Sequence, residues 1–284
     1  MPKLTISRDE WLQAASYGDL AKLEAWNKSG ALEIRYDPVR VGATVAQGRA
    51  KIFDVSDTDK ENALHKAVRS GQTAYALRLL ELGKFPETRN VKGETPLIQA
   101  AAMGQEGLVS TLISAGHGVN VQDKKGNTAL TLAIKKKSVH VVSLLLEAGA
   151  SIKPSVSFSP LHEAVSANHP ALVEMLLERG ADANELSPSG MGTSFHRMAA
   201  NWDKEDSDQE TPRRQIMRLL IRAGANTEEG VMENSGVMTP LRDIFYYKAA
   251  FDITLPAEIA AIQAEQLEQN TASPQPRRSS PTRL

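Results

Sequence analysis

The chain has 284 residues, of which 41% are hydrophobic and 24% are charged, so it carries enough apolar surface for a folded core. Its 33 Lys and Arg residues nearly balance its 34 Asp and Glu residues, and the net charge of −1 argues against a general attraction to nucleic acid or to a membrane surface. Because it contains no cysteine, disulfide bonds and thiolate metal sites are excluded, and its longest apolar clusters are far shorter than the roughly 18 to 20 residues that a membrane-spanning helix needs.

The first 61 residues differ in pattern from those that follow. Residues 1–32 place apolar residues at helical spacing around Trp11 and Leu23, with Gly18 between them, and this predicts two short helices. The N-terminus lacks the continuous apolar stretch of a secretory signal, so we expect a cytoplasmic protein. Residues 33–61 carry scattered aromatic and branched residues such as Tyr36 and Val41, which predict an elongated finger or a hairpin.

From residue 62 onward the chain repeats itself with a period close to 33 residues. Helix-ending glycines have spacings of 33, 33, 31 and 44 residues and are Gly83, Gly116, Gly149, Gly180 and Gly224. The second positions of a four-residue head motif have spacings of 33, 33, 31 and 34 residues and are Ala63, Pro96, Ala129, Pro160 and Ser194. Two markers that stay in register over five units indicate a repeat architecture.

Each unit has the residue types that a pair of short helices requires. Thr95 and Ser159 can cap the orphan N–H groups of a first helix, and the proline that follows each of them suits its first turn. A glycine such as Gly149 can close the second helix in the left-handed conformation. One unit cannot bury its own apolar face, so we expect the units to stack on one another.

The repeated motifs resemble those of the ankyrin family. The head motif is similar to Thr-Pro-Leu-His-x-Ala, and the segment from Leu176 to Asn184 follows the family pattern Leu-Leu-x-x-Gly-Ala-x-x-Asn. The resemblance covers roughly residues 10 to 245 and implies an all-α, ankyrin-type helical repeat solenoid with β-turn fingers. The expected segments are an N-terminal capping repeat at 1–32, the inserted finger at 33–61, repeats at 62–93, 94–126, 127–157, 158–190 and 191–236, a C-terminal capping repeat at 237–269, and a tail at 270–284.

Two segments depart from the repeat pattern. Residues 203–212 are strongly acidic and predict a loop inserted into the last full repeat. Residues 270–284 contain three prolines and three arginines without apolar periodicity, so this tail is expected to be disordered. Before the tail, a helix that carries Ile262 and Leu267 is expected to cap the stack.

The sequence contains no recognisable catalytic apparatus. His65, His162 and His196 occupy the same slot of the head motif, where the resemblance implies a structural role in tying neighbouring turns by hydrogen bonds. They lie on different repeats and lack the third ligand that a zinc site would need. Phosphate-binding loops, dinucleotide fingerprints and nucleophile elbows are also absent. We therefore expect a protein that is not an enzyme and has no cofactor and no metal.

Candidate partner-binding residues fall at positions that the resemblance places in the concave groove of an ankyrin stack. They are Lys124 and Lys125 at a turn tip, Lys135 and Lys136 on a first helix, and Tyr17, Arg69, Met103 and Trp202 after the paired small residues of their units. Arginine and aromatic residues are enriched among the energetically dominant residues of interfaces. For the lysines, the alternative is a solvated surface with no binding role.

These observations predict a protein–protein interaction module that binds a partner through the groove of a repeat stack. The lysines favour a partner with an acidic surface, and neither nucleic acid nor a membrane is expected as a partner. Two alternatives remain, of which the first uses the same groove. One is an inhibitor of the antitoxin or immunity type that occludes a partner enzyme, and the other is a secreted bacterial effector that acts in the cytosol of a host cell. The sequence determines neither the partner nor the oligomeric state.

Overall fold

The computed structural model describes residues 6–33, 35–36, 50–51, 56–82, 88–153, 159–187, 192–199, 211–226, 231–232, 238–239, 260–262, 264–265 and 267–268. The chain divides into two compact units, residues 1–163 and residues 164–284, which we call unit 1 and unit 2. Trp202, the acidic segment 203–210 and the tail 270–284 lie outside the described residues. In the described part of the chain, no helix has the length and apolar character to cross a membrane.

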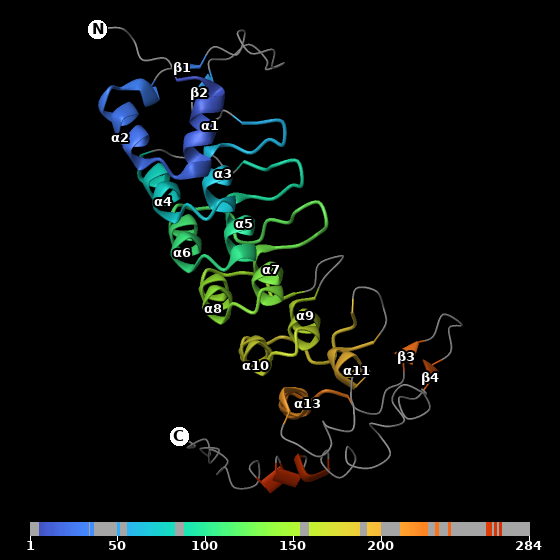
Figure 1. The fold of residues 1–284 in the computed structure, drawn as a ribbon. Helices are drawn as coiled ribbons and strands as arrows, with labels where there is room; N and C mark the ends of the chain where they lie inside the picture. Colours follow the sequence, from blue (N-terminus) through green and yellow to red (C-terminus); the bar gives the residue numbers. More distant parts are fainter. Residues whose placement is uncertain are drawn as a thin grey trace, which may run out of the picture. The chain divides into compact units, whose positions relative to one another are not determined.

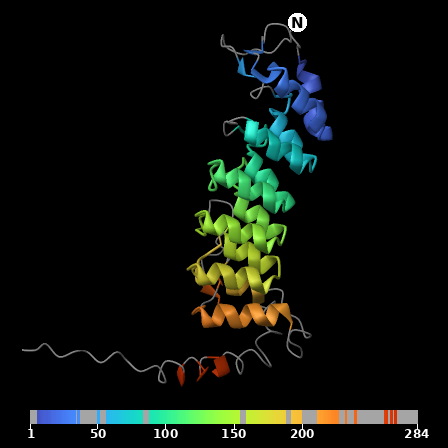
Figure 2. The same cartoon turned by 90° about the vertical axis from the view of Figure 1, so that its left-hand side faces the viewer.

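Unit 1 is a stack of helix pairs whose first helices form one row and whose second helices form another (Figure 1). The inner row contains α1 (Arg8–Tyr17), α3 (Ala63–Arg69), α5 (Pro96–Met103) and α7 (Ala129–Lys135). The outer row contains α2 (Leu20–Lys28), α4 (Thr73–Leu82), α6 (Glu106–Ser114) and α8 (Val139–Glu147). The view turned by 90° shows these helices lying one above another (Figure 2). Loops that we call fingers project beside the inner row and comprise residues 56–62, 88–95 and 121–128.

The head residues of the repeats start the inner helices as predicted. Asn62 and Thr95 accept hydrogen bonds from the backbone N–H groups three residues further on. Thr128 does the same, and Thr131 returns the interaction by accepting from the backbone of Thr128. Each cap satisfies an N–H group that the helix leaves unpaired, and replacing such a cap by alanine typically costs about 1 kcal/mol.

The core of unit 1 forms where successive pairs contact one another. Leucines from the inner row are fully buried in each layer, namely Leu64, Leu97 and Leu130. The outer row contributes Leu79, Leu112 and Leu145, which are also fully buried. At the N-terminal end, Trp11 and Trp26 pack with their ring centroids 5.8 Å apart. Burying such side chains stabilises the fold by roughly 1.5 to 3 kcal/mol each, and most of that burial requires a neighbouring repeat.

An asparagine four residues after the closing glycine links consecutive repeats within each unit. Asn120 donates to the carbonyl oxygen of Gly149 over 3.1 Å and accepts from the backbone N–H of Ser151 over 2.7 Å. Asn184 makes the equivalent pair of bonds in unit 2, to the backbone of Gly224 and Asn226. The backbone groups at these turns have no hydrogen-bond partner within a helix, so the asparagine side chain supplies one and adds a polar link to the apolar stacking.

Unit 2 repeats the same plan. The boundary between the units falls within α9 (Pro160–Ser166), so unit 2 contains the last three residues of that helix, together with α10 (Pro170–Glu178), α11 (Ser194–Ala199) and α13 (Pro212–Arg222). Helix α13 already begins at Pro212, with Thr211 as its cap, so it starts within the last residues of the predicted acidic insertion. In the predicted C-terminal capping helix, Ile262 is buried, whereas Leu267 is 66% exposed.

Two short strand pairs accompany the helices. After a 3-10 turn at Ala31–Glu33, strand β1 (Arg35–Tyr36) pairs antiparallel with β2 (Ala50–Lys51). This pairing agrees with the hairpin predicted in the N-terminal insertion. In unit 2, β3 (Val231–Met232) pairs with β4 (Met238–Thr239), a pairing that the sequence analysis did not predict.

The head-motif histidine of the second repeat ties two fingers together. His65 is buried, and its Nε2 lies 3.2 Å from the carbonyl oxygen of Glu94 in the next finger. Its Nδ1 lies 2.8 Å from the side-chain oxygen of Asn62. This agrees with the structural role expected for the histidine. Burial lowers the pKa of His65, and this effect outweighs the opposing influence of the Glu94 carbonyl and the nearby carboxylates.

The closing glycines give a direct test of the repeat register. Gly149 has a φ of +83°, and a Cβ there would meet no other atom within 4 Å. Gly149→Ala should therefore lower the free energy of unfolding through the left-handed backbone alone, by about 1 to 2 kcal/mol. The matched control is Gly107→Ala in α6, which has open space around it and no positive φ. It should raise the stability by up to about 1 kcal/mol in urea titrations. If both variants change stability in the same direction, the register is wrong.

The buried imidazole of His65 predicts an acid-sensitive fold. Because its pKa is lower in the folded chain, the unfolded chain binds more protons below the ordinary histidine value of about 6.5. The stability contribution is complete above that pH and is lost as the pH falls below it, by up to about 1.4 kcal/mol per pH unit. Melting temperatures between pH 7.5 and 5.5 should fall more steeply for the wild type than for His65→Gln. Parallel pH profiles would show that His65 does not contribute.

Candidate partner-binding surface

The fold leaves the C-terminal ends of the inner helices of unit 1 exposed. In α5 the residues from Pro96 to Ala101 are all buried, whereas Ala102 and Met103 at the C-terminal end are exposed. Tyr17 is 73% exposed at the corresponding end of α1. We call the surface formed by these helix ends and by the fingers of unit 1 the inner face. Side chains on it can vary without emptying the core, because the buried positions of each helix precede them.

Backbone hydrogen bonds hold the fingers of the inner face in register. The N–H of Val91 donates to the carbonyl oxygen of Asp59 over 2.8 Å, and the N–H of Lys124 donates to that of Lys92 over 2.9 Å. Within the last finger, the Asp123 carboxylate accepts the N–H groups of Lys125 and Asn127. The exposed lysines at the finger tips therefore project from a fixed backbone.

A buried carboxylate organises the polar residues between fingers and helices. The Glu61 side chain is only 4% exposed and pairs with Lys66 over 3.3 Å and with Arg69 over 3.1 Å. Gln99 from the next repeat donates to its other oxygen over 3.2 Å. Lys66 also pairs with Asp57. Partial burial by itself raises the pKa of Asp57, but Lys66 and two backbone N–H groups outweigh it and hold the pKa below its usual value.

Arg69 is held at one end and open at the other. Its Nη2 contacts the buried Glu61, whereas 53% of its side-chain surface is exposed on the inner face. A guanidinium fixed in this way loses less conformational freedom when a partner binds than a freely rotating one does.

Lys135 occupies the position of α7 that Arg69 occupies in α3. Its Nζ lies 3.1 Å from the side-chain oxygen of Asn127 and 4.0 Å from a carboxylate oxygen of Glu163. Lys136, which follows, caps the helix end and is exposed.

Lys137 adopts a backbone conformation that favours glycine. Its φ is +61°, at the position where the inner helices α1 and α5 end in Gly18 and Gly104, with φ of 69° and 71°. A lysine there experiences steric strain between its Cβ and the backbone that glycine avoids. Lys60, at a finger tip, also has a positive φ, of 59°. Exposed lysines thus stand at two left-handed positions of the inner face.

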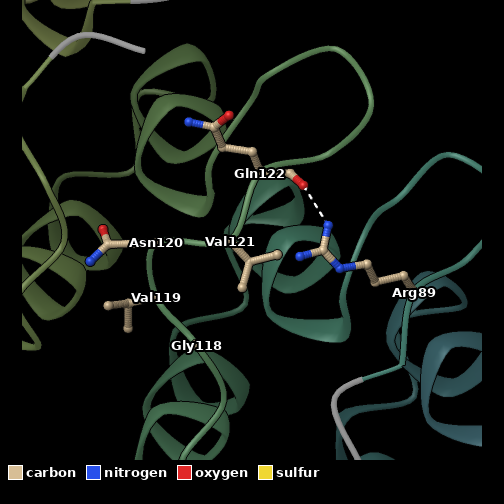
Figure 3. Close-up of a pocket in the computed structure, with 6 residues that line it drawn as sticks. All are labelled: Arg89, Gly118, Val119, Asn120, Val121 and Gln122. Atoms are coloured by element: carbon tan, nitrogen blue, oxygen red, sulfur yellow. Dashed lines mark hydrogen bonds between the residues drawn. The ribbon is translucent and has the colours of Figure 1, made fainter. Parts of the chain in front are cut away.

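A shallow depression lies between two fingers of unit 1 (Figure 3). It has a volume of about 550 Å³ and is lined by Arg89 and by residues 118–122. The Arg89 guanidinium donates to the carbonyl oxygen of Gln122 over 3.0 Å, and Asn120 is engaged in the link between repeats. The depression is a seam between repeats and lacks the convergent polar groups of a small-molecule site. Across the described residues, no cluster of His, Asp and Glu is arranged to hold a metal ion.

Comparison with known proteins agrees with this architecture. A family model for ankyrin repeats (3 copies) matches residues 13–123 and 103–186, which together make up more than half of the chain. The chain belongs to the ankyrin repeat family. Ankyrin repeat domains are in general protein–protein interaction modules rather than enzymes.

Solved structures of the same family share the fold. The human ASB11 ankyrin repeat domain is 21% identical, with a TM-score of 0.61, and the match covers 89% of this chain and 96% of that one. The ankyrin repeat domain of Bcl-3, a member of the IκB protein family, is also 21% identical, with a TM-score of 0.60 and coverage of 80% and 90%. At this identity the likeness establishes the fold alone. No curated protein matches the sequence.

The ankyrin fold brings most of the predicted binding residues to one surface. Tyr17, Arg69, Met103, Lys135 and Lys136 lie at the ends of inner helices, and Lys124 and Lys125 lie at a finger tip. Trp202 lies outside the described residues. Lys60, Lys92 and Lys137 were not among the predicted residues. The repeat alignment could have found Lys92, which lies 33 residues before Lys125 at an equivalent tip.

The strained backbone at Lys137 predicts that lysine makes the fold less stable at this position than glycine would. Lys137→Gly should raise the free energy of unfolding by up to about 1 kcal/mol, since glycine adopts a positive φ without strain. Lys136→Gly is the matched control, because Lys136 has an ordinary helical φ of −75° and glycine there adds only backbone freedom. This control should lower the stability. Urea titration of both variants measures the difference, and destabilisation by Lys137→Gly would contradict the strain.

Proposed function

We propose that unit 1 binds a partner protein through its inner face and that the partner presents acidic groups to it. The observation that carries this proposal is the set of exposed cations held in defined positions, with Arg69 anchored by Glu61 and Lys135 by Asn127. Tyr17 and Met103 supply exposed apolar surface beside them. Arginine, tyrosine and methionine are residue types that interfaces enrich.

The backbone strain at Lys137 supports a binding role for the lysines. A glycine would satisfy the fold better at this left-handed position, as it does at Gly104. Strained residues tend to cluster at functional sites, where a side chain contributes something that stability alone does not favour. Here the lysine adds a positive charge next to Lys135 and Lys136.

Local charge is the appropriate mechanism for a chain whose net charge is −1. The positive potential of clustered lysines attracts an acidic surface over roughly one Debye length, about 8 Å at physiological salt, and accelerates association. The same attraction discriminates against basic partners. Partner choice on this surface would therefore depend on ionic strength.

Charge reversal on the inner face tests the proposal. Lys125→Glu combined with Lys136→Glu changes two exposed residues, so the melting temperature should remain close to that of the wild type. Association with the natural partner, captured from an extract of the source organism and identified by mass spectrometry, should slow about tenfold at low ionic strength. The difference should shrink as salt is added, since salt screens the attraction.

The matched control reverses two exposed cations at the ends of outer-row and unit 2 helices, Lys28→Glu and Arg179→Glu. It should capture the same partner as the wild type with the same kinetics. Equal association of the inner-face variant and the control would contradict the proposal. The captured partner also separates two functions: loss of its enzymatic turnover on binding would identify the chain as an inhibitor, and unchanged turnover would identify an adaptor.

A further inference from the structure

Resting on the proposed function, we infer that the inner face of unit 1 binds an extended peptide segment in which two acidic side chains flank an apolar one. One acidic group contacts Arg69, the apolar group packs on Ala102 and Met103, and the second acidic group contacts the end of α7 at Lys135 and Lys136. The segment therefore runs along the stack across three consecutive inner helices, α3, α5 and α7.

The two cationic positions are equivalent in the repeat. Arg69 and Lys135 are 66 residues apart, which is twice the 33-residue period, so they occupy the same place on α3 and α7. Each is tied to the residue that precedes the cap of its own helix, Glu61 for Arg69 and Asn127 for Lys135. The fold thus presents two pre-positioned positive groups with one repeat between them.

The anchors leave part of each cation accessible to a ligand. The Arg69 side chain is 53% exposed and that of Lys135 is 37% exposed. Glu163 lies 4.0 Å from the Lys135 ammonium, which is a long separation for an ion pair, and a partner carboxylate at hydrogen-bond distance can compete with it. Lys136 and Lys137 are exposed next to it and add positive charge at this end.

The inner helix of the intervening repeat, α5, ends in an uncharged, apolar surface. Ala102 occupies the position of Arg69 and Lys135 on α5, and it is exposed. Met103 follows it and is 41% exposed. A methionine side chain adapts its shape to an apolar group. An acidic side chain of the ligand would meet no cation at Ala102. An apolar side chain packed on Ala102 and Met103 would be removed from water, which favours binding.

The repeat geometry sets the spacing of the ligand. Packed helices lie about 8 to 10 Å apart, so two steps from α3 to α7 span roughly 16 to 20 Å. An extended chain advances about 3.3 Å per residue. The two acidic residues should therefore be about six positions apart, because an even separation keeps both side chains on one side of an extended chain, with the apolar residue two or four positions after the first.

Selection from a phage-displayed library of random twelve-residue peptides tests this inference with the full chain as target. Peptides enriched on the wild type should carry two acidic residues at that separation around an apolar residue. The same enrichment should appear on the control Lys28→Gln/Arg179→Gln and should disappear on Arg69→Gln/Lys135→Gln. Thermal melting of each target establishes that the variants are folded.

A variant that adds a cation tests the inference by a new binding preference, so the result does not rest on loss of binding. Ala102→Lys places a third cation at a position where Lys135 shows that the repeat accepts lysine. Peptides selected on it should carry an additional acidic residue in the middle in place of the apolar one. In fluorescence anisotropy, changing one acidic residue of a selected peptide to its amide should weaken binding to the wild type about tenfold. The same acid-to-amide change in the peptide should have little further effect on its affinity for the target variant that lacks the cation facing that residue.

No enrichment, enrichment without the acidic spacing, or equal enrichment on the Arg69→Gln/Lys135→Gln target would overturn the inference. These outcomes are distinct from failure of the proposed function, which is measured by capture of the natural protein partner. If that capture still depends on Lys125 and Lys136, the inner face binds a partner, but not a segment of this chemistry.

Discussion

Stacking of units that cannot fold alone is the constraint on which the structure depends. A pair of helices of about ten residues or fewer buries too little apolar surface to offset the entropy of ordering its chain. Leu64, Leu97 and Leu130 become fully buried only because another repeat lies against them. Caps, closing glycines and the asparagine links all serve this stacking, since they fix the direction in which one pair leads to the next.

The same constraint decides which residues are available for binding. The buried positions of α5 extend from Pro96 to Ala101, and the small Ala100 and Ala101 among them allow close approach of neighbouring helices. The final positions of the inner helices of unit 1 are exposed, so Tyr17, Met103 and Lys136 can differ completely in chemistry at equivalent places. A binding surface therefore arises beside the core without competing with it.

Polar contacts beneath this surface connect stability with recognition. Glu61 is buried among Lys66, Arg69 and Gln99, so one carboxylate both links two repeats and orients an exposed guanidinium. Removing both cations would leave this buried carboxylate without a compensating charge, which costs several kcal/mol, on the order of 3 to 5. Lys137 shows the opposite relation, since its side chain contributes charge at a backbone position that glycine would stabilise. The inner face therefore contains both a side chain held in place by buried contacts, Arg69, and a strained backbone position, Lys137.

The sequence by itself determined the repeat period, threonine caps such as those at Thr95 and Thr128, and the all-α fold, because these follow from local backbone chemistry and from apolar spacing along the chain. The period also placed Arg69 and the lysines of the third repeat on a common surface. Only the tertiary structure decided that Glu61 anchors Arg69, and that Lys135 lies against Asn127 and Glu163. Those contacts join residues on different turns or repeats, and their geometry depends on how the helices and fingers pack, which no local pattern specifies.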